Sequence, residues 1–210
     1  MHSSGNGEAY YFDYLKAGLT FPRNIYFAAK YRIVRDFIYS FPPGSAILDA
    51  CCGVGFVTSS FTSDYDVYGI DIQSDSIEFC KENHDGTYSV EDVYGLPFED
   101  GQFAGVVIND AIEHLFDPPE ALRELHRVLR PGGKIEVCTE NYDSYLWLAL
   151  ENTWYRVCGG NCKPYDHEVH PSRYTPKKMR QDLGQFFEVE MLVLRNLNMK
   201  MFAVARKDSQ

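Results

Sequence analysis

One stretch near the start of the chain, residues 47–56 (ILDACCGVGF), constrains the fold more than any other part of the sequence. A short apolar run ends at Asp49, and a turn follows that contains Gly53 and Gly55. Glycine lets the backbone bend sharply and lie close to a ligand. A helix that starts after such a turn would direct its free N–H groups to the same place. The pattern predicts a strand that delivers a nucleotide-like ligand to a helix N-terminus, with that helix over residues 55–62.

A second strand of the same kind follows at residues 68–72 (YGIDI) and ends at Asp71. An acid about twenty residues after a glycine turn is placed to accept hydrogen bonds from ribose hydroxyls. We therefore predict that Asp71 and its neighbour Ile72 contact an adenosine-containing cofactor.

The details of the turn distinguish between two such cofactors. The dinucleotide fingerprint G-x-G-x-x-G needs a third glycine, but Thr58 stands in its place. The carboxylate of Asp49 would also repel a pyrophosphate, whereas it would attract the ammonium group of S-adenosylmethionine. An NAD-dependent oxidoreductase is accordingly the less favoured alternative.

Four motifs in order over residues 45–140 resemble those of the class I S-adenosylmethionine-dependent methyltransferases. Residues 49–55 are similar to motif I, (L/V)-(L/D)-D-x-G-C-G-x-G, with Cys51 in place of the usual glycine and Cys52 at the family cysteine. The other three are residues 91–103 (EDVYGLPFEDGQF), 106–115 (VVINDAIEHL) and 123–134 (RELHRVLRPGGK). The resemblance is to the small-molecule branch, the "type 11" enzymes of quinone biosynthesis and sugar O-methylation.

The alternation of apolar runs and helical patterns predicts an α/β fold with helices on both faces of a mostly parallel sheet. Strands are expected near residues 45–50, 66–71, 86–90, 103–109 and 133–139. Helices are expected over 8–18, 23–40, 74–83, 118–130, 142–157 and 175–183. Residues 186–194 and 198–206 are expected to close the sheet as an antiparallel hairpin.

The resemblance implies a single doubly wound domain with a seven-stranded sheet whose last strand is antiparallel. We expect an N-terminal helical cap (residues 8–40), a cofactor-binding core (45–140), an inserted lid after strand five (141–172), and a C-terminal helix and β-hairpin (173–210). Substrate choice is expected to lie in the cap and the lid.

The motifs and the resemblance also name candidate site residues. Asp92 lies near the adenine amino group in the family, Asn109 ends strand four, and Tyr14 could close over the cofactor. His114 follows strand four and is a candidate general base or acceptor-orienting group; His167 and His170 in the insertion are further catalytic candidates. The predicted cofactor-binding set is Asp49, Ala50, Cys51, Gly53, Gly55, Asp71, Ile72, Asp92, Val93, Asn109 and Tyr14.

Cysteine and histidine spacing raises the question of a metal. Cys158, Cys162, His167 and His170 lie within thirteen residues, but the gap between the histidines is shorter than in most zinc sites. We therefore expect no metal and interpret the two cysteines as reduced thiols. Six cysteines without a visible signal peptide indicate a cytoplasmic protein.

The net charge of −10 disfavours a nucleic-acid partner. The basic cluster at Arg173, Lys177, Lys178 and Arg180 is typical of a solvated helix face. No apolar run is long enough to span a bilayer. The sequence therefore predicts a methyltransferase that uses S-adenosylmethionine and acts on a small molecule, with oxygen as the favoured acceptor atom. A non-catalytic protein that keeps the fold and the cofactor is the other alternative.

Overall fold

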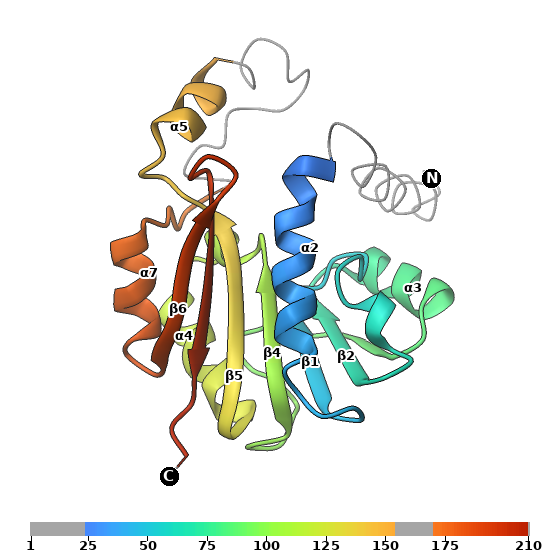
Figure 1. The fold of residues 1–210 in the computed structure, drawn as a ribbon. Helices are drawn as coiled ribbons and strands as arrows, with labels where there is room; N and C mark the ends of the chain where they lie inside the picture. The colour runs from blue at the N-terminus through green and yellow to red at the C-terminus, as the bar shows by residue number, and fades with distance from the viewer. Residues whose placement is uncertain (1–23, 154–169, 210) are drawn as a thin grey trace.

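The computed structural model describes residues 24–153 and 170–209, and its centre is a seven-stranded sheet of order β3-β2-β1-β4-β5-β7-β6 (Figure 1). Strands β1 to β5 run parallel, and β7 pairs antiparallel with both β5 and β6. The predicted doubly wound sheet with an antiparallel end is confirmed. The strands are β1 Ala46–Ala50, β2 Asp66–Asp71, β3 Thr87–Val90, β4 Phe103–Asn109, β5 Leu129–Glu140, β6 Glu188–Arg195 and β7 Lys200–Arg206.

Helices begin where the sequence places capping residues. Asp117 precedes two prolines and its carboxylate accepts the N–H of Glu120, as an N-cap should. Thr175 caps the last helix by accepting the N–H of Lys178. The helices are α2 Asn24–Ile38, α3 Ser74–Asn83, α4 Pro118–Val128, α5 Tyr145–Asn152 and α7 Pro176–Leu183, with two 3₁₀ turns, η1 Ser59–Phe61 and η2 Ile112–His114.

The sheet is covered on both faces. On one face Val34 and Ile38 of α2 pack against Ile47 and Val107 of the sheet. On the other face α4 and α7 bury a larger apolar cluster that includes Leu125 of α4. This two-sided burial explains why the central strands are almost continuously apolar.

The strand order fixes where a ligand can bind. The chain steps from β1 outward to β2 and β3, then crosses back to β4 on the other side of β1. Ligands of doubly wound sheets bind beyond the carboxyl ends of the strands at this reversal. In Figure 1 those ends lie at the upper edge of the sheet, the same edge that the N-terminal end of α2 approaches.

The prediction of a helix over residues 55–62 is wrong. Gly55 is left-handed, with φ of 67°, and only the short turn η1 forms after it. The segment also contains Val57, Thr58, Ser59 and Ser60, which are weak helix formers. The side chain of Thr58 bonds to Asp49 instead of pointing to solvent, which fixes the segment against β1.

Other predicted boundaries differ by a few residues, and β5 begins at Leu129, earlier than the expected residue 133. The predicted helix 8–18 lies outside the described residues. So does most of the expected lid; its described parts are residues 141–153, including α5, and 170–172. Among the residues that the structure describes, no helix has the length and apolar character needed to cross a bilayer.

Candidate functional site

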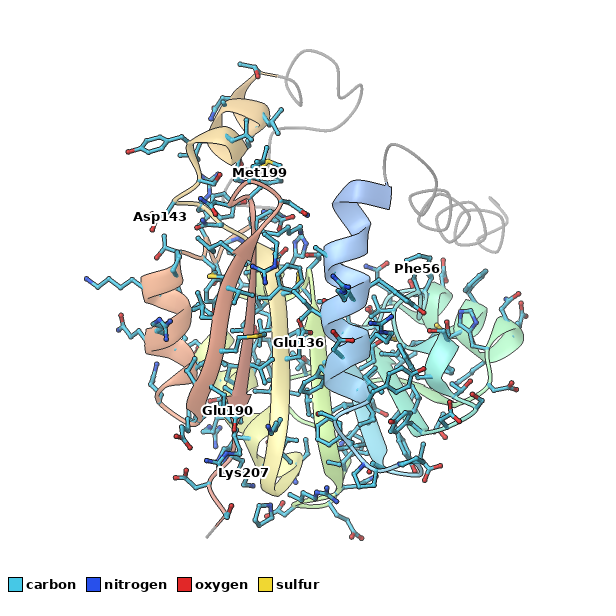
Figure 2. All side chains as sticks on the ribbon, in the orientation of Figure 1. Phe56, Glu136, Asp143, Glu190, Met199 and Lys207 are labelled. Atoms are coloured by element: carbon cyan, nitrogen blue, oxygen red, sulfur yellow. The ribbon has the colours of Figure 1, made fainter. Side chains whose placement is uncertain are left out.

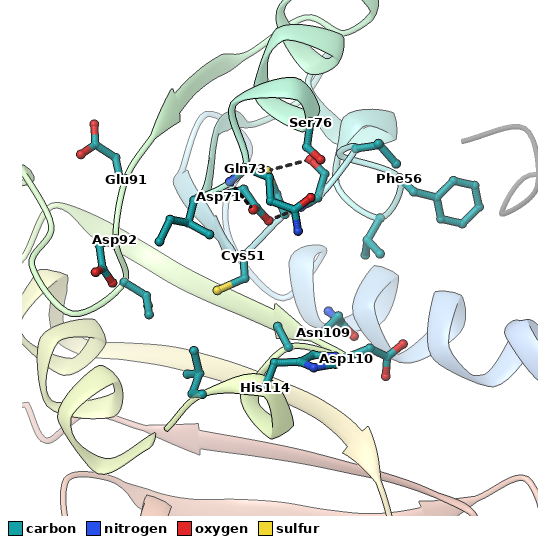
Figure 3. A pocket seen from close by; sticks show the side chains of 18 of the residues that line it. Cys51, Phe56, Asp71, Gln73, Ser76, Glu91, Asp92, Asn109, Asp110 and His114 are labelled. Atoms are coloured by element: carbon teal, nitrogen blue, oxygen red, sulfur yellow. Dashed lines mark hydrogen bonds between the residues drawn. The ribbon is translucent and has the colours of Figure 1, made fainter. Parts of the chain in front are cut away.

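A pocket of about 830 Å³ lies at the carboxyl ends of β1, β2 and β4 (Figure 3). The predicted residues that line it are Cys51, Gly53, Asp71, Ile72, Asp92, Val93, Asn109 and His114. They come from loops far apart in the sequence, and the parallel sheet brings them together because its strand ends share one edge. The site is therefore where the strand order predicted it.

The glycine turn uses its own N–H groups. Gly53 donates to Asp71 Oδ2 at 2.9 Å, Cys52 donates to the carbonyl of Ile70, and Gly55 donates to the carbonyl of Cys52. No α-helix follows the turn, so the prediction that helical N–H groups face the ligand at this point is wrong. The turn is fixed by these hydrogen bonds and forms one wall of the pocket, and it does not have the form of a phosphate-binding loop.

Cys51 and Asp110 share an unusual backbone conformation. They follow β1 and β4, line the pocket, and have φ of 59° and 50°. Non-glycine residues seldom adopt this left-handed conformation, and such strain clusters at functional sites. Burial, followed by the charges of Asp71 and Asp49, raises the pKa of the Cys51 thiol to about 12, so the thiol stays neutral.

Asp71 is held in one orientation at the pocket wall. Its Oδ2 accepts the N–H of Gly53 and its Oδ1 accepts the N–H of Gln73, both at 2.9 Å (Figure 3). Each carboxylate oxygen can accept a further hydrogen bond. The carboxylate is therefore fixed in place and still able to accept bonds from a ligand hydroxyl.

Asp49, Ala50 and Gly55 do not line the pocket, although Ala50 and Gly55 are adjacent in sequence to residues that do. Asp49 is only 3% exposed and accepts a hydrogen bond from Thr58 Oγ1 at 2.5 Å. Burial raises the pKa of Asp49 to about 7, against the opposing effects of Thr58 and of the Lys30 charge. Asp49 is thus a buried carboxylate outside the pocket lining, and its ionisation responds to nearby charge.

Asn109 is the last residue of β4 and lines the pocket. Its Nδ2 donates to Oε2 of Glu136 at 3.1 Å; Glu136 lies on β5 beside α2 (Figure 2). Burial raises the pKa of Glu136 to about 8. Among the described residues, Oδ1 of Asn109 has no hydrogen-bond partner. That oxygen is shielded from solvent, so the orientation of the amide is set by its bond to Glu136.

A charged cluster beside the pocket was missed from the sequence. Asp110 pairs with Lys30 at 2.8 Å and with Lys200 at 2.6 Å, and Lys200 also bonds to Glu140. Burial alone would raise the pKa of Asp110, but the two lysines outweigh it and hold that pKa below its usual value. The only signal in the sequence was that Asp110 follows Asn109; its partners are 80 and 90 residues away.

Two of the three candidate catalytic histidines are described. His114 lines the pocket, whereas His170 is 3% exposed behind it, with 4.5 Å between the two ring centroids. Burial, followed by the proximity of His114, lowers the pKa of His170 to about 4, so His170 is neutral. His167 and the cofactor candidate Tyr14 lie outside the described residues.

The far end of the pocket is formed by the loop after β3. Asp92 Oδ1 accepts the N–H of Tyr94 at 3.1 Å, which shapes the loop, and Val93 packs inward with 5% exposure. Asp92 and Glu91 lie along the same side of the pocket (Figure 3). An apolar surface beside carboxylates suits a flat heterocycle with an exocyclic amine.

The charge of the lining selects between ligand classes. Four acids line the pocket, namely Asp71, Glu91, Asp92 and Asp110, and the single lysine among the lining residues, Lys30, is paired with Asp110. Such a wall favours a cation and disfavours a pyrophosphate, because nearby like charges repel in a site of low dielectric constant.

Comparison with known proteins agrees with this geometry. Residues 48–137 match the family described as "Methyltransferase domain". The chain is 34% identical over 124 residues to a 2-phytyl-1,4-naphtoquinone methyltransferase of Trichormus variabilis, covering 54% of each protein. It is 38% identical over 105 residues to a demethylmenaquinone methyltransferase of Staphylococcus aureus, covering 46% of this chain and 43% of that protein. The chain spans about half the length of the curated relatives it matches.

Solved structures share the fold. A SAM-dependent methyltransferase from Methanosarcina mazei superposes with a TM-score of 0.68 at 21% identity, covering 83% of this chain and 98% of that one. A geranyl diphosphate methyltransferase in complex with GPP and sinefungin has a TM-score of 0.65 at 15% identity, covering 85% of this chain and 77% of that one. These similarities establish the architecture of the sheet and its helices.

Proposed function

We propose that this chain transfers a methyl group from S-adenosylmethionine to a small molecule, because residues 48–137 match a methyltransferase domain family and the fold is that of a SAM-dependent methyltransferase structure. The observation that carries the proposal is the pocket at the strand reversal. It has a carboxylate, Asp71, fixed in a position that suits ribose hydroxyls, three further lining acids, and only a short 3₁₀ turn after the glycine turn, where a dinucleotide site has an α-helix. S-adenosylmethionine carries a sulfonium and an ammonium and no phosphate, so it fits this wall where NAD does not.

The described residues suggest how the cofactor would lie. In this proposal Asp71 accepts the ribose hydroxyls, and Asp92 with Val93 holds the adenine. Asn109, at the end of β4, lies beside the methionine part of the cofactor. Cys51 and Gly53 contribute the turn along which the methionine part runs. Ala50 and Gly55 support that turn from behind, and Asp49 adds negative charge without direct contact.

We propose an apolar ring compound with a hydroxyl group as the acceptor. Aromatic and aliphatic side chains also line the pocket, namely Tyr31, Phe56, Val57, Leu115 and Phe116. Curated relatives at 34–38% identity are named as methyltransferases of quinones, which supports an acceptor of this shape. Oxygen as the methylated atom is part of the proposal.

The chemistry is an in-line displacement at the sulfonium methyl group. The cofactor supplies the reactive carbon, and the protein holds the acceptor oxygen in line and excludes water. The oxygen must lose its proton, and His114 is the described histidine that faces the pocket. We assign His114 to that side of the reaction, as a base or as a group that orients the acceptor.

The remaining assignments follow from charge and cysteine usage. A net charge of −10 supports a small molecule over a nucleic acid, and two residues of the basic cluster have acidic partners: Arg173 pairs with Glu151 and Lys178 with Asp182. The four described cysteines are free thiols, which supports a location in the cytoplasm.

The proposal is tested by incubating the protein with S-adenosylmethionine and a panel of hydroxylated naphthoquinones and phenols. We expect S-adenosylhomocysteine to form only with an acceptor present, and the product to carry one methyl group on oxygen by NMR. His114→Ala should lower kcat by about a hundredfold or more while leaving cofactor affinity nearly unchanged. The matched control is His126→Ala on α4, away from the pocket. Tight cofactor binding with no turnover on any acceptor would favour the non-catalytic alternative.

A further inference from the structure

A second group of potential ligands lies directly behind the acceptor side of the pocket. The carboxylate of Glu113 and the imidazoles of His114 and His170 each offer one ligand atom, and these atoms all lie within 4.8 Å of one another. Glu113 and His170 are 1% and 3% exposed, whereas His114 reaches the pocket. The group is therefore enclosed on one side and open to the pocket on the other.

Three segments of the chain fix these side chains together. Glu113 and His114 are adjacent in η2. The carbonyl of Glu113 accepts the N–H of Ser172 at 3.1 Å, which joins the segment carrying His170 to η2. Tyr142 donates its N–H to the carbonyl of Tyr174, which joins the end of β5 to the same segment. The convergence of the three side chains is thus built by backbone hydrogen bonds between distant parts of the chain.

Hydrogen bonds set the orientation of His170 and Glu113. Tyr142 Oη lies 2.5 Å from Nδ1 of His170, which orients the imidazole ring. Thr139 Oγ1 donates to Oε2 of Glu113 at 2.8 Å. Histidines and carboxylates that bind metals typically have partners of this kind, which fix the ring and direct the lone pairs.

We propose that Glu113, His114 and His170 bind one divalent metal ion such as Zn²⁺, with an open coordination position facing the pocket. Two imidazoles and one carboxylate suit zinc and the neighbouring divalent metals. Three protein ligands leave room for a further oxygen ligand, as in catalytic metal sites.

The role of this ion rests on the proposed function. An acceptor hydroxyl that binds at the open position would have a lowered pKa and would release its proton to solvent as it enters the site, because a metal ion stabilises the oxygen anion. That oxygen then forms a bond to the sulfonium methyl carbon while the carbon–sulfur bond breaks and its electron pair returns to sulfur. In this arrangement His114 orients the acceptor through the ion and does not act as a free base.

The test is a metal titration that needs no acceptor. Protein dialysed against chelator is titrated with Zn²⁺ by calorimetry and with Co²⁺ by visible absorption. We expect one equivalent to bind, and Tyr142→Phe to weaken binding by about 10–100-fold, as the loss of a supporting hydrogen bond does elsewhere. His114→Ala should weaken it at least as much, and since His114 is exposed this variant should fold. His126→Ala is the matched control and should bind as the wild type does.

Two further measurements distinguish this metal site from a site at the cysteines and from a failure of the proposed function. A double variant, Cys158→Ser with Cys162→Ser, should retain binding; loss there combined with retention in His114→Ala would assign the ion to the cysteines and overturn the proposal. Each protein is also titrated with S-adenosylhomocysteine. If the wild type binds S-adenosylhomocysteine but takes up neither Zn²⁺ nor Co²⁺ in the metal titrations, the metal site is overturned and the proposed function still stands.

Discussion

At the scale of single residues, Cys51 combines a backbone conformation that favours glycine with a side chain that lines the pocket. Its backbone has φ of 59°, where a side chain is strained, and its side chain lines the pocket. Family motif I usually has glycine at this position. The sequence showed that Cys51 replaces this glycine, but the left-handed conformation became evident only in the structure.

Replacing Cys51 should separate strain from packing. A non-glycine residue in the left-handed region costs about 1–2 kcal/mol, and glycine removes this cost at the expense of about 0.5–1 kcal/mol in unfolded-state entropy. Cys51→Gly should thus unfold at the same or slightly higher urea concentration than the wild type, and Cys51→Val at a lower one. Cys51→Ala is the control, because it removes the thiol and keeps the strain. A Gly variant less stable than the Ala variant would contradict this account.

Asp49 should make cofactor affinity depend on pH. Burial holds its pKa at about 7 in the free protein, so the carboxylate is partly protonated at neutral pH. A cationic ligand nearby favours the ionised form, which lowers that pKa on binding and releases protons. The affinity for S-adenosylhomocysteine should therefore rise between pH 6 and 8, measured by calorimetry in buffers of different ionisation enthalpy.

Asp49→Asn should flatten this rise, since the amide does not titrate. Glu136→Gln is measured alongside, because the pKa of Glu136 is about 8 and its carboxylate bonds to Asn109 in the pocket. A pH profile that Asp49→Asn leaves unchanged would show that Asp49 does not influence the ligand.

At the scale of elements, the site depends on contacts that no local pattern encodes. The strands and most helices could be predicted because apolar runs, the Asp117 cap and Thr175 mark them. The failure over residues 55–62 has a tertiary cause, since Thr58 bonds to Asp49 and Gly55 is left-handed. The cluster around Lys200 could not be predicted either, because it joins the ends of β4, β5 and β7.

Lys200→Met tests how much this cluster holds the elements together. Removing the lysine leaves Asp110 and Glu140 without their shared cation, and breaking a buried ion pair costs about 3–5 kcal/mol. Urea unfolding followed by circular dichroism should show a loss of that size. Arg123→Ala, which breaks an exposed pair with Glu120, should cost less than about 1 kcal/mol. Equal losses in the two variants would rule out a special role for the cluster.

At the scale of the whole molecule, the strand order determines which predictions could succeed. Asp71 and Asn109 could be predicted to lie at the pocket because each ends a recognisable strand, and Asp92 and His114 because they lie in motifs that resemble those of the family. A parallel sheet gathers such positions at one edge. Asp49 was expected to point into the site, but it lies behind the wall, because sequence does not reveal which way the last side chain of a strand faces. Tyr14 and His167 remain predictions, since they lie outside the described residues.

The most direct test of the central claim is calorimetric titration of the purified protein with S-adenosylhomocysteine, with NAD in parallel. The account predicts one-site binding of S-adenosylhomocysteine and no heat with NAD. Asp71→Ala should weaken binding by about a hundredfold or more, because two hydrogen bonds to a charged group contribute about 1.5–3 kcal/mol each. Asp75→Ala, an exposed acid at the start of α3, should have no effect. Binding of NAD alone would contradict the assignment of this pocket to S-adenosylmethionine.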